Sequence, residues 1–233
     1  MVQKMLVSAV FAGFAAGLIA ALLQFAFVQP VLLEAELYES GELNHFNGVS
    51  EIGASDHGHD HGDSAEVAGE FTRNALSVVF SGLVYVAYAL ILVAGFALAA
   101  SRGITITARS GMIWGIAGFV AVHLAPGFGL APELPGSSAA EVGPRQVWWF
   151  VCVTATALGL ALIGLGQNML LWGLGALAIL LPHLIGAAQP SSFNGVAPPE
   201  LAALFAARAF GVGLAAWTCL GLFAGYLWQR DAA

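Results

Sequence analysis

The chain has 233 residues, of which 59% are hydrophobic and only 9% are charged, and its mean hydropathy is +0.83. A soluble globular chain carries roughly 25% charged residues, so these values exclude a water-soluble domain and predict an integral membrane protein. The net charge of −7 is local, because ten of the fourteen acids lie between Glu34 and Glu70. With only seven Lys and Arg, the chain lacks the basic surface that binds nucleic acid, and we expect no nucleic-acid partner.

Six apolar runs predict an all-α, polytopic bundle of about six transmembrane helices in a single membrane domain, 1–233. A spanning helix needs about 20 apolar residues. The third run is the shortest, and a helix must stop or kink at Pro126, so five spans remain possible. The predicted helices are 5–28, 75–100, 111–125, 147–165, 169–187 and 204–228.

The distribution of basic residues predicts how the bundle is oriented. With six helices, four of the seven Lys and Arg fall on one side: Lys4, Arg102, Arg109 and Arg230. The other three share the opposite side with thirteen of the fourteen acids. By the positive-inside rule, the N-terminus is cytoplasmic and the long polar segment 29–74 is extracytoplasmic. We expect a multi-pass protein in the lipid bilayer of the bacterial inner membrane.

A run of alternating imidazoles and carboxylates stands in this polar segment: Asp56, His57, His59, Asp60, His61 and Asp63, with His45 upstream. Imidazole nitrogen and carboxylate oxygen together suit divalent first-row transition metals. The alternative is a solvated low-complexity loop without function. We interpret the run as a metal-capture site, although such a loop cannot by itself favour Co²⁺ over Cu²⁺ or Ni²⁺.

Two further histidines lie near the outer ends of predicted helices, each beside a proline. His123 precedes Pro126 by three residues, and His183 follows Pro182 directly. Ionisable side chains inside a membrane segment indicate function by default, whereas an interfacial histidine bonded to a backbone carbonyl is the structural alternative. Because His123 and His183 are expected at the same depth in the membrane, we interpret the two together as part of an ion path.

Three acids are expected at the same outer face, namely Glu34, Glu36 and Glu133. Each is equally compatible with an ordinary solvated carboxylate, but together with His123 and His183 they predict a vestibule that removes water from an ion. The two cysteines, Cys152 and Cys219, lie in apolar runs and are interpreted as buried small hydrophobic residues. Small-xxx-small pairs at Gly13/Gly17, Gly111/Gly115 and Gly221/Gly225 are candidate helix contacts.

Catalytic signatures are missing from the sequence. It contains no H-E-x-x-H, no G-x-S-x-G and no P-loop, so neither hydrolytic chemistry nor ATP binding is indicated. We therefore expect a protein that is not an enzyme and has no prosthetic group.

The sequence resembles the CbtA family, the proposed cobalt transporter subunit. The resemblance rests on Gln29-Pro30-Val31 with Glu34-Ala35-Glu36, the histidine-bearing loop, 123–136, 145–149, Pro182 to Ala187 and Gln189-Pro190. It implies cobalt uptake linked to cobalamin synthesis, and a small single-helix, histidine-bearing partner called CbtB. The family is usually described with five transmembrane segments, one fewer than the apolar runs counted here.

These observations favour a membrane subunit that takes up Co²⁺ or a related divalent metal as cargo. The loop would concentrate the ion, and the outer-face histidines and glutamates would line its entrance. The competing hypothesis is a membrane-embedded metal sensor or assembly protein that binds the ion without moving it.

Overall fold

The computed structural model describes residues 2–44 and 63–232, and this part of the chain contains helices and no strand. The predicted all-α class is confirmed. In chain order the elements are α1 (Val2–Leu23), the π-helix η1 (Gln24–Val28), α2 (Gln29–Glu39), α3 (Asp63–Ala100), α4 (Ala108–Phe119), the π-helix η2 (Val120–Leu124), α5 (Ala125–Gly127), α6 (Val142–Leu165), α7 (Met169–Ile185) and α8 (Pro199–Ala232).

Five helical stretches of the described chain are long and apolar enough to cross a membrane: Met5–Glu39, Phe71–Ala100, Ala108–Gly127, Val142–Leu165 and Pro199–Arg230. The sixth helix, α7, is apolar but has only 17 residues. At 1.5 Å per residue it measures about 25 Å, slightly less than the ~30 Å hydrocarbon core. The structure therefore agrees with about six membrane helices, of which five are full-length spans.

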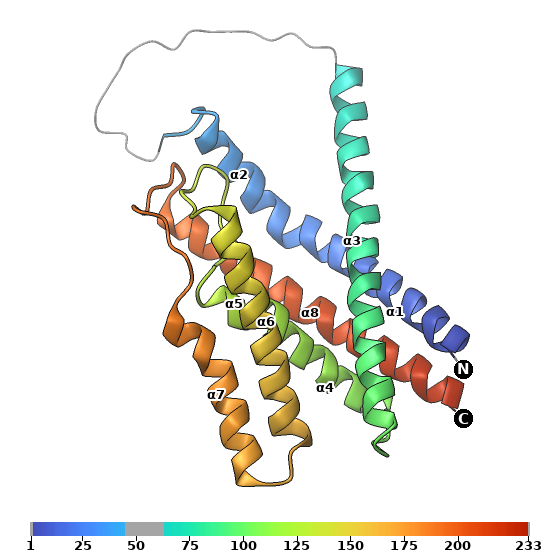
Figure 1. Cartoon of the computed structure of the whole chain (residues 1–233). Coiled ribbons are helices and arrows are strands. Elements are labelled where there is room, and N and C mark those ends of the chain that lie inside the picture. The colour runs from blue at the N-terminus through green and yellow to red at the C-terminus, as the bar shows by residue number, and fades with distance from the viewer. Residues whose placement is uncertain (1, 45–62, 233) are drawn as a thin grey trace.

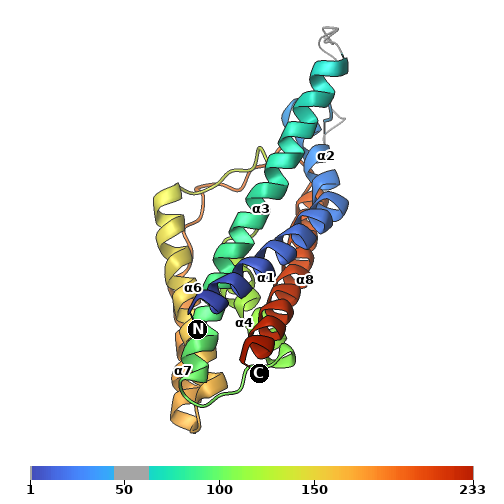
Figure 2. The same cartoon turned by 90° about the vertical axis from the view of Figure 1, so that its right-hand side faces the viewer.

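The helices pack as three antiparallel pairs (Figure 1): α1 with α3, α4 with α8, and α6 with α7. The first two pairs join through α1 and α8 into a four-helix unit, which we call the body; α6 and α7 form the hairpin beside it (Figure 2). Both termini lie at one end of the molecule, the terminal end, as the six-helix prediction requires. The opposite end, the loop end, carries α2 and the segments 128–141 and 186–198.

Glycines bring the paired helices close together, and all three predicted small-residue pairs lie at such crossings. A Cβ on Gly221 would lie 2.7 Å from the Cα of Gly115, and one on Gly111 would lie 2.7 Å from the Cα of Gly225. Two of the predicted pairs therefore pack on each other, between α4 and α8. Close backbone approach of this kind is a main source of helix association in lipid, where hydrophobic burial gives no net drive.

The other two helix pairs also cross at glycines. Gly17 of α1 packs on Gly82 of α3, where an added Cβ would lie 2.7 Å from the Gly82 Cα. In the hairpin, a Cβ on Gly175 would lie 2.7 Å from the carbonyl oxygen of Gly159. Each antiparallel pair is thus fixed in register by at least one position that accepts no side chain.

The long polar segment was predicted to run from Gln29 to Asn74, and this is wrong at both ends. The first helix continues through the π turn and through Gln29-Pro30 to Glu39, and α3 begins at Asp63. Proline is tolerated in the first turn of a helix, where its missing N–H would have no partner. Packing supports the extension, because Val31 and Ala35 are buried against Leu134 and Leu201 at the loop end.

Two other helices begin five residues before their predicted starts. Helix α6 starts at Val142 rather than at 147, and α8 starts at Pro199 rather than at 204. In both cases a proline stands in or beside the first turn, a position that hydropathy alone does not assign to a helix. At Pro126 the expected stop is found, since α5 ends at Gly127.

Candidate functional site

His123 is half-buried among the helices of the body. It stands on η2, the π-helical turn that follows α4. Three aromatic rings surround its imidazole: Phe119 stacks at a centroid distance of 5.9 Å, Trp217 lies at 6.1 Å and Tyr88 at 6.2 Å, both edge-on. These rings, which we call the His123 cage, come from α4, α8 and α3 respectively.

One nitrogen of this imidazole has no partner. His123 Nε2 is inaccessible to solvent and makes no hydrogen bond in the described part of the chain. Leaving a buried polar atom unpaired costs about 1–3 kcal/mol, and a group of this kind needs an explanation such as a bound ion. A neutral imidazole nitrogen is a ligand for borderline divalent metals, so His123 Nε2 is a candidate donor atom inside a membrane helix.

Two π-helical turns occupy similar places, η1 directly after α1 and η2 directly after α4. Each spans five residues and is followed one residue later by a proline, Pro30 after η1 and Pro126 after η2. At η1, Arg208 of α8 donates a hydrogen bond of 3.0 Å from Nη1 to the carbonyl oxygen of Phe27. Such turns occur frequently at functional sites, since they disturb the regular backbone hydrogen bonding.

His183 occupies a different environment, in the hairpin. Its Nε2 lies 3.9 Å from the Sγ of Cys152, which is fully buried on α6. The ring also contacts Trp148 and Phe128 edge-on, at 5.9 and 6.1 Å. His183 stands two residues before the end of α7.

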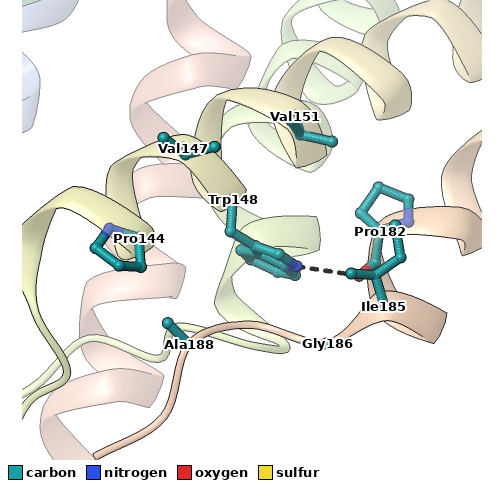
Figure 3. A pocket seen from close by; sticks show the side chains of 8 residues that line it. All are labelled: Pro144, Val147, Trp148, Val151, Pro182, Ile185, Gly186 and Ala188. Carbon is teal, nitrogen blue, oxygen red and sulfur yellow. Dashed lines mark hydrogen bonds between the residues drawn. The ribbon is translucent and has the colours of Figure 1, made fainter.

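A hydrogen bond ties α6 to α7 beside His183. Trp148 Nε1 donates to the carbonyl oxygen of Pro182 at 3.0 Å, as the dashed line in Figure 3 shows. The same residues border an apolar hollow of about 510 Å³. It is lined by Pro144, Val147, Trp148, Val151, Pro182, Ile185, Gly186 and Ala188.

The three predicted acids all lie at the loop end, but in different settings. Glu34 and Glu36 are exposed on α2. Glu133 is paired with Arg145, at 2.9 Å between Oε2 and Nη2. Around this pair the segments 128–141 and 186–198 are joined by hydrogen bonds, among them one from Gln189 Nε2 to the carbonyl oxygen of Gly129 at 2.9 Å.

A family model described as "Probable cobalt transporter subunit (CbtA)" matches residues 2–229 of the sequence. The chain belongs to the CbtA family. The resemblance seen in the sequence is thereby confirmed, and the description of CbtA proteins as subunits implies a partner. No curated protein and no solved structure matches the chain.

The predicted site of this CbtA protein is only partly covered by the structure. His45, Asp56, His57, His59, Asp60 and His61 lie outside the described residues. Asp63 is the first residue of α3. Within the described residues, no three His, Cys, Asp or Glu side chains come together to hold a metal. The vestibule of His123, His183, Glu34, Glu36 and Glu133 stays a prediction. The two imidazoles share no ring neighbour among the described residues.

No local pattern in the sequence connects Cys152 with His183, and Cys152 was interpreted only as a buried apolar residue. It is buried and free of disulfide bonding, as expected. Its neighbour is 31 residues away in sequence, so the contact depends on the register of the hairpin. Of the His123 cage, Phe119 stands one turn before the histidine and was accessible to helical periodicity. Tyr88 and Trp217 belong to helices that are distant in sequence, so periodicity within one helix could not identify them.

Proposed function

We propose that this CbtA chain is the membrane subunit through which Co²⁺, or a related divalent transition metal, enters the cell. The observation that carries the proposal is the family match over nearly the whole chain, joined to an unpartnered imidazole nitrogen inside a membrane helix. An ionisable group at membrane depth is costly and is retained where it faces an ion path. His123 is the residue on which we expect transport to depend most.

The histidine and aspartate run provides the capture step in this proposal. Helix α2 ends and α3 begins at the loop end of the molecule, so the intervening segment is attached at that end. His45, His57, His59 and His61, with Asp56, Asp60 and Asp63, bind the ion loosely and raise its concentration there. Carboxylates beside imidazoles neutralise the charge of a divalent ion and orient the rings.

The ion then meets the outer acids and the two histidines in succession, not all at once. Glu34 and Glu36 are exposed and free to attract a cation. Glu133 already has the guanidinium of Arg145 as a partner, which reduces its attraction for a cation. His123 and His183 lie deeper, in separate environments, and replace part of the hydration shell of the ion.

The energy for uptake comes from the membrane potential in this account. Moving one elementary charge through 100 mV is worth about 2.3 kcal/mol, so a divalent ion gains roughly 4–5 kcal/mol, enough for about 10³-fold accumulation. The required orientation places the loop end outside. The terminal end, which carries Arg102, Arg109 and Arg230, then faces the cytoplasm of a bacterial inner membrane, in accordance with the positive-inside rule.

A single-helix, histidine-bearing partner of the CbtB type is the expected second subunit. The family is described as a transporter subunit, which implies a second subunit. Within this chain, α7 is shorter than a full span. We place the partner in the same bilayer.

Metal accumulation in cells tests the function directly. Cells that express the chain with its single-helix partner are supplied with Co²⁺, Ni²⁺, Zn²⁺ or Cu²⁺, and the metal content is measured against cells with an empty vector. We expect Co²⁺ to accumulate. Binding of Co²⁺ to isolated membranes without accumulation in cells would instead support a sensor or assembly protein.

A shortened chain that lacks 55–64 tests the capture step separately. We expect the Co²⁺ concentration for half-maximal uptake to rise while the maximal rate is retained. A matched control replaces His57, His59 and His61 by Gln, which keeps the segment length. Unchanged uptake in both variants would remove the loop from the account.

A further inference from the structure

Cys152 and His183 form a thiol–imidazole pair that the capture loop and the His123 cage do not include. Cys152 is fully buried on α6, and His183 is half-buried on α7. The side chains point toward each other across the hairpin, with 3.9 Å between Sγ and Nε2. The imidazole therefore offers the accessible side of the pair, and the sulfur lies behind it.

This separation is close to that of two ligands on one metal ion. In tetrahedral zinc sites the metal–sulfur distance is about 2.3 Å and the metal–nitrogen distance about 2.0–2.1 Å, which places the two donor atoms about 3.5–3.6 Å apart. The observed 3.9 Å differs from this by only a few tenths of an ångström. Without metal, the same two atoms make a weak sulfur–nitrogen contact.

Neighbouring contacts hold the pair in place. Trp148 lies one turn before Cys152 on α6, and its indole donates to the Pro182 carbonyl, next to His183. Pro182 is inside α7 and has no N–H for the carbonyl oxygen of Ala178, which loses its helical donor. The hairpin therefore holds the Cys152 sulfur and the His183 nitrogen side by side.

We propose that Cys152 and His183 bind Co²⁺ as a thiolate and an imidazole, with water or a residue of the partner subunit completing the coordination. The inference deepens the proposed function and relies on it for the identity of the ion. On binding, the Cys152 S–H bond breaks, a cobalt–sulfur bond forms, and the proton is released to the solvent. No electron is transferred.

Such a pair distinguishes transition metals from the hard cations Mg²⁺ and Ca²⁺. Mg²⁺ and Ca²⁺ require hard oxygen ligands, whereas thiolate and imidazole favour transition metals. A path that passes Cys152 and His183 therefore excludes the abundant Mg²⁺.

Absorption spectroscopy of the full-length protein in detergent tests the site. Co²⁺ is added under a non-thiol reductant, and the thiolate-to-cobalt charge-transfer band in the near ultraviolet is recorded. We expect the band in the wild-type chain and in Cys219→Ser, the matched control at the second free cysteine. It should be absent in Cys152→Ser, and His183→Ala should weaken Co²⁺ binding roughly tenfold or more. Excess Mg²⁺ should leave the band unchanged.

The histidine and aspartate run does not interfere with this measurement, because imidazoles and carboxylates give no thiolate-to-cobalt band. A chain without 55–64 should therefore keep the band. A wild-type chain without the band, or a band that persists in Cys152→Ser, would overturn the site. Size-exclusion profiles confirm that each variant is folded, and His183→Ala provides a second measurement if Cys152→Ser is not. Accumulation of Co²⁺ without the band rejects this site alone, whereas the band without accumulation rejects the proposed function alone.

Discussion

The body and the hairpin each carry one histidine, and the two sites differ in chemistry. In the body, His123 is enclosed by aromatic rings, and its Nε2 has no partner in the described structure. In the hairpin, His183 faces the sulfur of Cys152. A lone imidazole in an apolar cage binds an ion weakly and releases it, whereas a thiolate–imidazole pair discriminates between ions. In this account, His123 lets the ion pass, and the Cys152–His183 pair selects which ion is bound.

The two regions also differ in how they are held together. The body consists of two similar units, α1–η1–α2 with α3 and α4–η2–α5 with α8, each with a π turn followed by a proline. Within each unit, the two paired helices cross at glycines. The hairpin instead depends on the Gly159–Gly175 crossing, the Trp148 hydrogen bond, and the Asn168 side chain, which caps α7 by accepting from Leu171 N.

Gly221→Leu should have the largest effect, because it separates α4 from α8 within the body. Its Cβ would lie 2.7 Å from the Gly115 Cα, where only backbone can move. Overpacking typically costs 1–3 kcal/mol and more at a backbone contact, so we expect roughly 3 kcal/mol or more and little folded protein. The measurement is the yield of monodisperse protein and its thermal midpoint.

Gly211→Leu is the matched control on the same helix, since no atom lies within 4 Å of the added Cβ. Its midpoint should be unchanged or slightly raised, because leucine is the better helix former. An equal loss of yield and thermal midpoint in Gly221→Leu and Gly211→Leu would contradict the assigned α4–α8 crossing.

Trp148→Phe should have an intermediate effect, confined to the hairpin. It removes the donor to the Pro182 carbonyl, which still accepts from Gly186 N. We expect a loss of about 1 kcal/mol, with faster hydrogen exchange at the end of α7 and unchanged exchange in α8. Trp149→Phe, which keeps the contact with Phe150, is the control. Uniformly faster exchange over both regions would show that the hairpin and the body unfold together.

Glu133→Gln should have the smallest effect. Its ion pair with Arg145 is partly exposed, with side-chain exposures of 35% and 26%, and such pairs contribute about 0–1 kcal/mol. We expect a small loss of stability that vanishes at high salt, and less effect on uptake than Glu34→Gln with Glu36→Gln. A larger effect on uptake from Glu133→Gln would show that this acid contacts the ion.

The sequence was sufficient to predict the helical class and the approximate number of spans, and it marked three candidate glycine pairs, because hydropathy and small-residue spacing are local signals. It did not predict the helix ends at Glu39 and Asp63, since Gln29-Pro30 has the composition of a loop and only tertiary packing of Val31 and Ala35 keeps it helical. The residues that contact His123 and His183 could not be predicted from local sequence patterns. They come from other helices, and helix register decides which side chains meet.

Co²⁺ influx into vesicles that contain the purified chain and its single-helix partner, under an inside-negative potential, tests the central claim most directly. The account predicts rapid influx in wild-type vesicles and a rate roughly tenfold or more lower in His123→Phe, a variant that keeps the aromatic packing and removes the imidazole nitrogens. Influx no faster than in protein-free vesicles, or a His123→Phe rate equal to that of the wild type, would contradict it.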